Sequence, residues 1–160
     1  MTSIYKDITS IGMGLTNKCN LNCAHCYSRA LPIQSLTLDG VKKILADFPN
    51  LKKVNFGTGE SILNPELVPI MAYYRERGIE MALTSNGTTI EALSDKHLKW
   101  FKDVDISLDF PSRKLHDHWR HPGAYNKAMA GLLRCTRLGI NTSIALCLTN
   151  INYQYLPQFK

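Results

Sequence analysis

The stretch Cys19-Asn20-Leu21-Asn22-Cys23-Ala24-His25-Cys26-Tyr27 places three cysteines within eight residues, spaced C-x3-C-x2-C. It directly follows an apolar run, residues 8–16, that is typical of a β-strand. Three thiolates so close together, with no fourth cysteine nearby, suit a cubane [4Fe–4S] cluster, because three protein ligands leave one iron open to a small molecule. The spacing therefore favours an iron–sulfur cluster on the loop after a first strand.

Three other interpretations compete with the cluster. A disulfide framework is disfavoured because the number of cysteines, five, is odd and no secretory signal precedes them. A structural zinc site needs four ligands, usually as separated pairs, and His25 would be an awkward fourth ligand beside Cys26. The cysteines could also be incidental. Zinc is the main alternative.

The C-x3-C-x2-C spacing, with a histidine before the last cysteine, resembles that of the radical S-adenosylmethionine (SAM) enzymes. The resemblance implies that Cys19, Cys23 and Cys26 ligate the [4Fe–4S] cluster and that the open iron binds SAM. The reduced cluster of that family cleaves SAM to methionine and a 5′-deoxyadenosyl radical, which abstracts hydrogen from a substrate. His25 takes the place of the residue that usually packs near the adenine. An electron donor such as flavodoxin or ferredoxin is also implied.

The composition is that of an ordinary globular domain of 160 residues, 44% hydrophobic and 20% charged. No apolar run approaches the roughly 18 residues that a membrane span needs. The formal charge of +6 arises from scattered basic residues, which favours a mixed, solvated surface over a nucleic-acid face. Free cysteines without a secretion signal predict a reducing, cytoplasmic setting.

Strand-like and helix-like segments alternate along the chain, which predicts βαβ crossovers and an α/β fold with a parallel sheet. The predicted strands are 8–16, 54–56, 80–84, 104–108 and 142–148; the predicted helices are 41–48 after an N-cap at Thr37, a helix starting at Pro65, 90–101 and 125–138. The resemblance implies a partial (β/α)6 TIM-like barrel with about five βα units. Residues 1–160 would then be a radical SAM core domain that is cut short at its C-terminus.

Four polar segments fall at predicted strand ends, where sites gather in such sheets. They are the cysteine loop, Gly57-Thr58-Gly59-Glu60, Ser85-Asn86-Gly87 and Ser107-Leu108-Asp109. Without a Cβ, glycine lets the backbone approach a ligand closely. Residues 57–60 resemble the family's Gly-Gly-Glu-Pro sequence, which binds the methionyl ammonium, although Thr58 and Ser61 depart from it. The alternative is a glycine-rich turn.

The other polar strand ends offer hydroxyl, amide and carboxylate groups. Ser85, Asn86, Ser107 and Asp109 suit hydrogen bonds to a ribose and a carboxylate, which are the contacts that the resemblance implies. Ordinary turn chemistry is the competing explanation, since Asn-Gly and Ser are common turn residues.

Two later segments complete the predicted cofactor contacts. His116-Asp117-x-x-Arg120 resembles the family's HD-x-x-R pattern, in which the arginine lies near the SAM carboxylate. Three histidines and an aspartate over 116–121 could alternatively bind a transition metal, and a loop with surface histidines is the simplest alternative. Asn150, at the exit of the fifth strand, is a further predicted SAM contact. Cys147 is expected to be a small buried residue.

The favoured substrate is a peptide, because the sequence Cys-Asn-Leu-x-Cys-x-His-Cys-Tyr resembles that of peptide-modifying, SPASM-type members of the family. The cysteine-rich C-terminal extension of those enzymes is absent from this sequence. Cofactor biosynthesis and nucleic-acid modification stay open. Two hypotheses of other classes are a non-catalytic zinc-binding α/β module and a flavodoxin-like domain with incidental cysteines.

Overall fold

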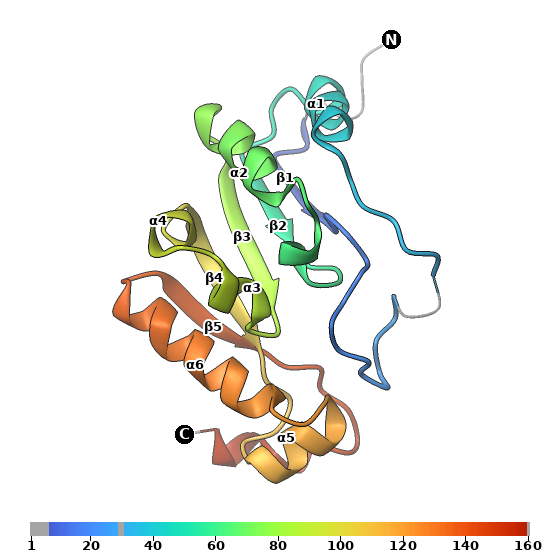
Figure 1. The fold of residues 1–160 in the computed structure, drawn as a ribbon, viewed down its shortest axis with the longest axis vertical. Helices are drawn as coiled ribbons and strands as arrows, with labels where there is room; N and C mark the ends of the chain where they lie inside the picture. The colour runs from blue at the N-terminus through green and yellow to red at the C-terminus, as the bar shows by residue number, and fades with distance from the viewer. Residues whose placement is uncertain (1–6, 29–30, 160) are drawn as a thin grey trace.

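The protein is built on one parallel β-sheet, as a computed structural model that describes residues 7–28 and 31–159 shows (Figure 1). Its five strands lie in the order β1-β2-β3-β4-β5, the order in which they occur in the sequence. The strands are β1 (Ser10–Met13), β2 (Lys53–Phe56), β3 (Glu80–Ser85), β4 (Phe101–Ser107) and β5 (Asn141–Ala145). Every neighbouring pair is parallel, which confirms the predicted sheet.

Helical segments connect the strands; most of them pack on one side of the sheet, and α5 lies beyond the strand ends (Figure 1). The α-helices are α1 (Leu38–Asp47), α2 (Leu67–Glu76), α3 (Thr88–Ala92), α4 (Asp95–Leu98), α5 (Arg113–Trp119) and α6 (Ala124–Arg137); the 3-10 turns are η2 (Ser61–Leu63) and η3 (Tyr153–Gln158). Thr37 caps α1 as predicted, because its hydroxyl accepts a hydrogen bond from the Gly40 N–H at 3.1 Å.

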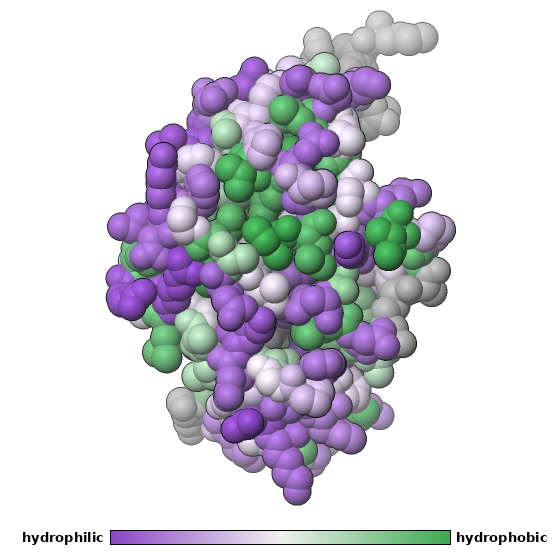
Figure 2. Space-filling view, in the orientation of Figure 1, coloured by the Kyte–Doolittle hydropathy of each residue, from purple (hydrophilic) through white to green (hydrophobic). Residues whose placement is uncertain are grey.

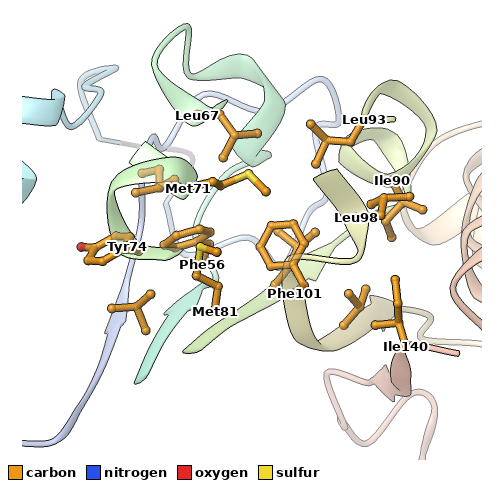
Figure 3. Packing of buried hydrophobic residues seen from close by; sticks show 14 of the residues in the cluster. Phe56, Leu67, Met71, Tyr74, Met81, Ile90, Leu93, Leu98, Phe101 and Ile140 are labelled. Carbon is orange, nitrogen blue, oxygen red and sulfur yellow. The ribbon is translucent and has the colours of Figure 1, made fainter. Parts of the chain in front are cut away.

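The core lies between the sheet and these helices (Figure 3). Strand side chains alternate between the two faces, so Val54 and Phe56 on β2 point to the same side. The ring of Phe56 packs edge-on against Phe101 and is tilted against Tyr74 on α2, with both centroid distances at 6.1 Å. We call this side of the sheet the apolar face. Its strand residues are Val54, Phe56, Met81, Leu83, Val104 and Ile106, all of them buried.

The opposite side of the sheet, the polar face, carries short and polar side chains. Strand pairing aligns Gly12, Asn55, Ala82, Asp103 and Asn141 in one row across all five strands. Asp103 accepts hydrogen bonds from the Lys53 ammonium at 2.9 Å and from the Asn141 amide at 2.6 Å.

Residues in the next row of the polar face lie closer to the strand ends. Thr84, Asp105 and Ser143 are neighbours in this row, and the Ser143 hydroxyl hydrogen-bonds the Asp105 carboxylate. The interior of a complete TIM barrel is filled by bulky branched residues, so this small and polar face differs from a packed barrel core.

Several element boundaries differ from those predicted from the sequence. The predicted helix 90–101 is two short helices, because Ser94 starts α4 by accepting a hydrogen bond from the His97 N–H and because Phe101 already belongs to β4. The predicted strands 8–16 and 142–148 are shorter in the structure, Ser10–Met13 and Asn141–Ala145. The long connection after β4 contains α5.

The outer surface is mixed. Hydrophilic residues cover much of the face shown in Figure 2, over α4, α5 and α6, while hydrophobic residues gather near its centre. Within residues 7–28 and 31–159, no helix is long and apolar enough to cross a membrane.

Candidate functional site

A cavity of about 240 Å³ lies at the carboxyl ends of the strands, beside the loop that carries the three cysteines. It brings together most residues that the sequence predicted for the cluster and the cofactor. The predicted residues that line it are Cys19, Cys23, His25, Cys26, Gly57, Thr58, Gly59, Glu60, Ser85, Asn86, Ser107 and Arg120. Asp109 and Asn150 are the two predicted residues outside this lining.

The thiols of Cys19, Cys23 and Cys26 share this cavity without forming a disulfide. Burial raises the pKa of the Cys19 and Cys23 thiols above its usual value. Donors nevertheless point at the sulfur of Cys19: the Leu21 N–H lies 3.5 Å away and the Asn86 amide nitrogen 3.7 Å away. Hydrogen bonds of this kind stabilise a metal-bound thiolate.

The chemistry of the three thiols suits an iron–sulfur cluster. Among residues 7–28 and 31–159, no group of three His, Cys, Asp or Glu side chains converges closely enough to hold one metal ion. The three cysteines line the same cavity, and soft thiolate donors are the usual ligands of iron–sulfur clusters. The same finding gives no support to a transition-metal site over residues 116–121.

Glu60 and Ser85 form a buried hydrogen-bond network in the wall of the cavity. The Glu60 side chain is 1% exposed and accepts hydrogen bonds from the Ser85 hydroxyl at 2.6 Å, the Asn86 N–H at 3.0 Å and the Thr89 N–H at 2.8 Å. The Thr89 hydroxyl also donates to it. This carboxylate therefore joins the end of β2 to the end of β3 and the start of α3.

Gly59 lets the β2 end pack against the start of the cysteine loop. Its φ of +65° lies in the left-handed region. A Cβ at this position would meet the Thr16 carbonyl oxygen at 2.4 Å and the Lys18 carbonyl oxygen at 2.6 Å. The Glu60 N–H donates to the same Lys18 carbonyl at 2.9 Å. The conformation thus holds the chain entering Cys19 against the GTGE turn.

Thr58, which departs from the family pattern, is accommodated by a glycine on the neighbouring strand end. A Cβ at Gly14 would lie 2.5 Å from the Thr58 Cβ, so Gly14 leaves room for the threonine. Gly14 therefore allows close packing at this strand end, whereas Gly12 has nothing within 4 Å of its Cβ position. The Thr58 hydroxyl lies 2.8 Å from the Tyr27 hydroxyl, which connects β2 to the cysteine loop.

Arg120 and Asp109 form a buried ion pair behind the cavity. The Arg120 Nε donates to the Asp109 Oδ2 at 2.5 Å, and the side chains are 11% and 0% exposed. The His25 Nε2 lies 3.7 Å from the same Oδ2. Burial lowers the pKa of His25, and its ring stacks on Trp119 with a centroid distance of 5.2 Å. Arg120 reaches the cavity, whereas Asp109 supports it from behind.

The HD-x-x-R segment lies on α5 rather than in a loop with surface histidines. His116 is 1% exposed, so the expectation of a surface residue is wrong for this histidine. Its Nδ1 accepts a hydrogen bond from the Asp109 N–H at 3.2 Å, and burial lowers its pKa to about 4. The Asp117 carboxylate accepts from the Tyr125 N–H at 2.8 Å, near the start of α6. The segment therefore fixes α5 between Asp109 and α6.

The segment after β5 differs from its prediction. Cys147 is exposed and lines the cavity, because β5 ends at Ala145 and Cys147 follows it; the expectation of a buried residue is wrong. Asn150 is exposed, and its SAM contact stays a prediction. The neighbouring Asn152 is fully buried and donates to the Asp109 carbonyl at 3.2 Å and the Cys147 carbonyl at 2.9 Å.

Five residues of the cavity wall were not predicted as site residues from the sequence: Leu21, Tyr27, Ser28, Thr84 and Cys147. Tyr27 and Ser28 directly follow the last motif cysteine, so proximity to the motif could have indicated them. Thr84 precedes Ser85 at the end of β3. Only the parallel register reveals that its side chain belongs to the polar face.

Comparisons with known proteins identify similar sequences and folds. The sequence profile of the radical SAM superfamily matches residues 13–159. Fe-coproporphyrin III synthase of Methanosarcina barkeri is 30% identical over 151 residues, which cover 89% of this chain and 38% of the relative. The subtilosin biosynthesis protein AlbA of Bacillus subtilis is 33% identical over 114 residues, which cover 66% of this chain and 25% of the relative. The chain thus spans less than half the length of these relatives.

Solved structures share the fold. Streptococcus suis SuiB bound to S-adenosylmethionine superposes with a TM-score of 0.75 at 12% identity, covering 94% of this chain and 36% of SuiB. SuiB bound to the precursor peptide SuiA gives the same TM-score at 16% identity. This likeness confirms the predicted α/β, partial TIM-like barrel. The profile match over most of the chain shows that it belongs to the radical SAM superfamily, whose enzymes use a [4Fe–4S] cluster and S-adenosylmethionine.

Proposed function

We propose that this chain forms the catalytic core of a radical SAM enzyme, with the cluster held by Cys19, Cys23 and Cys26. The observation that carries the proposal is that all three thiols line one cavity together with the β2, β3 and β4 ends. When bound and reduced, the cluster supplies the electron that cleaves SAM and so generates a 5′-deoxyadenosyl radical. The zinc-binding alternative is not favoured, because the chain matches the radical SAM superfamily.

The remaining lining residues would orient SAM. The backbone of Gly57, Thr58 and Gly59 borders the cavity and offers groups for the methionyl ammonium. The Arg120 guanidinium is suited to the SAM carboxylate, since it is a cation at the cavity wall. Ser107 presents a hydroxyl for the ribose or the carboxylate.

Three further predicted residues have hydrogen bonds that suggest an indirect contribution. Ser85 donates to Glu60, and the Asn86 amide donates to the Cys19 sulfur and to Asn20. Glu60, Ser85 and Asn86 would therefore hold the wall in shape and support the cysteine loop. Asn150 is retained as a SAM contact on the strength of the resemblance alone.

A peptide is the substrate class that we favour. The structural neighbour SuiB has been solved with a precursor peptide, and AlbA is a bacteriocin biosynthesis protein. The polar face of the sheet continues directly from the cavity, since Thr84 and Ser107 line the cavity and Asp105 lies next to both on that face. A face of carboxylates, amides and hydroxyls suits hydrogen bonds to peptide groups.

The reaction also needs an electron, and we propose a small redox protein such as flavodoxin or ferredoxin as its donor. A cytoplasmic setting would keep the cysteines reduced and available for the cluster.

Formation of 5′-deoxyadenosine tests the proposed function. The protein would be reconstituted anaerobically with iron and sulfide and then supplied with SAM and a strong reductant. Cys23→Ala should abolish the product, whereas Cys135→Ala should retain it, because Cys135 is a buried core residue of α6 outside the cavity. Equal product from wild type and Cys23→Ala, or no iron uptake by the wild type, would contradict the proposal.

A further inference from the structure

Asp109 is the point where four separate segments of the chain meet. Its side chain is 0% exposed, and both carboxylate oxygens are occupied. Oδ2 accepts from the Arg120 Nε at 2.5 Å, and Oδ1 accepts from the Cys147 N–H at 2.9 Å. The backbone is engaged as well, because its N–H donates to His116 Nδ1 and its carbonyl accepts from Asn152. One residue therefore joins the β4 end to α5, the β5 exit and the start of η3.

A buried carboxylate has to be compensated by hydrogen bonds and opposite charge, since its desolvation is costly. Arg120 supplies that charge, and it does so through Nε. Guanidinium donors lie in one plane in a fixed fork, so a bond at Nε sets the direction of the two terminal amino groups. Within the described part of the chain, these two groups make no hydrogen bond, and Arg120 lines the cavity. The ion pair with Asp109 thus leaves both terminal amino groups of this cavity-lining arginine without a protein partner among the described residues.

The cysteine loop reaches the same carboxylate through His25. This residue lies between Cys23 and Cys26, with its Nε2 3.7 Å from Asp109 Oδ2. The ring is parallel to Trp119 on α5, with an interplanar angle of 9°. The carboxylate therefore sits between the loop that carries the thiols and the arginine that faces the cavity.

We infer that Asp109 is a positioning residue: it aims Arg120 at the carboxylate of SAM and ties the cysteine loop to α5, without contacting SAM itself. This inference rests on the proposed function and replaces the direct contact that the sequence predicted for Asp109. It explains why a buried aspartate, rather than an apolar residue, follows β4 at this position.

The test compares two ligands that differ in the amino-acid group, which includes the carboxylate. S-adenosylhomocysteine carries the amino-acid part, and 5′-methylthioadenosine lacks it. Their dissociation constants would be measured by equilibrium dialysis on the reconstituted protein, together with its iron content. Asp109→Asn should weaken binding of S-adenosylhomocysteine about tenfold or more, leaving iron content and 5′-methylthioadenosine binding close to those of the wild type.

Asp117→Asn is the matched control, because it makes the same change in the same segment but lies outside the cavity and retains an oxygen for the Tyr125 N–H. It should bind both ligands like the wild type. A second variant keeps the test decisive if Asp109→Asn folds poorly. Arg120→Lys retains a cation for Asp109 but has no fork, so it should lose the same preference for the carboxylate ligand.

The double variant of Asp109→Asn and Arg120→Lys should lose no more of the preference for S-adenosylhomocysteine over 5′-methylthioadenosine than Arg120→Lys alone, because Asp109 acts through the arginine. Unchanged binding by Asp109→Asn, or an equal loss for both ligands, would overturn the inference. A wild type that takes up iron but binds neither ligand would instead count against the proposed function.

Discussion

The two faces of the sheet are made by alternate residues of the same strands, yet they have opposite chemistry. On β2, Val54 and Phe56 are fully buried under the helices, whereas Asn55 between them faces the polar side. On β4, Val104 and Ile106 alternate in the same way with Asp103 and Asp105. Because side chains alternate between the two faces every second residue, one face forms the stabilising core, and the other is left available for chemistry at the strand ends.

The largest expected effect tests this division directly on β2. Phe56→Ala should lower the free energy of unfolding by about 3–5 kcal/mol, because it removes a buried ring from the core and leaves a cavity. Asn55→Ala, one residue away, should change it by less than about 1 kcal/mol. Urea unfolding of the two variants checks the comparison. Equal losses would show that the polar face also belongs to the core.

The second prediction concerns the buried residues behind the cavity and depends on pH. Burial lowers the pKa of His116 from 6.5 to about 4 in the folded chain. The unfolded chain therefore binds the proton first, so stability should be complete above about pH 6.5 and fall as the pH drops toward 4. The loss would be up to about 3 kcal/mol.

The measurement is urea unfolding at several pH values, with His116→Asn as comparison. Asparagine retains an oxygen for the Asp109 N–H but has no titrating ring, so its pH dependence over this range should be weaker. Identical pH profiles for wild type and variant would show that another group controls the acid loss.

A third prediction separates backbone strain from steric contact. Gly59 and Gly78 have nearly the same φ, +65° and +67°, but only Gly59 has backbone atoms near its Cβ position. Gly78→Ala should lower the free energy of unfolding by about 1–2 kcal/mol from strain alone. Gly59→Ala should lower it by about 1–3 kcal/mol more, because the added methyl meets the chain leading into Cys19.

Iron uptake gives an independent check on the same pair of variants. Gly59→Ala should bind less iron on reconstitution, since its methyl displaces the cysteine loop, and Gly78→Ala should bind as much as the wild type. If both variants were equally stable and took up equal iron, the close packing at Gly59 would have no functional consequence.

The smallest expected effect is at the mouth of the cavity. Tyr27→Phe removes the hydroxyl that lies 2.8 Å from the Thr58 hydroxyl and should cost about 0.5–1 kcal/mol of stability. Tyr153→Phe is the control, because Tyr153 is also exposed and its hydroxyl makes no hydrogen bond to the described residues. Chemical denaturation measures both. An equal loss of stability for Tyr153→Phe would show that the effect of Tyr27→Phe does not come from the contact with Thr58.

Much of the fold and the cavity could be predicted from the sequence because the signals are local. Apolar, β-prone runs indicated the strands, Thr37 indicated a helix start, and the three cysteines indicated the loop at the first strand end. Parallel strands bring their ends to one edge, so the gathering of GTGE, Ser85-Asn86 and Ser107 followed from topology.

What could not be predicted depends on contacts between distant segments. Asp109 and Ser107 look alike as polar strand-end residues, yet only Ser107 lines the cavity, because Arg120 and the β5 exit enclose Asp109. Nothing local marks Gly14 as the partner of Thr58, which lies on another strand end. The split of the predicted helix 90–101 arose from Ser94, whose capping role competes with its place in a helical pattern.

The most direct test of the central claim is the metal content of the reconstituted protein, together with its electron paramagnetic resonance spectrum with and without SAM. We expect about four irons per chain and a reduced-cluster signal that changes when SAM is added. We expect loss of both in Cys23→Ala but not in Cys135→Ala. One equivalent of zinc, no iron and no response to SAM would contradict the claim that the three thiols hold a cluster with an open iron.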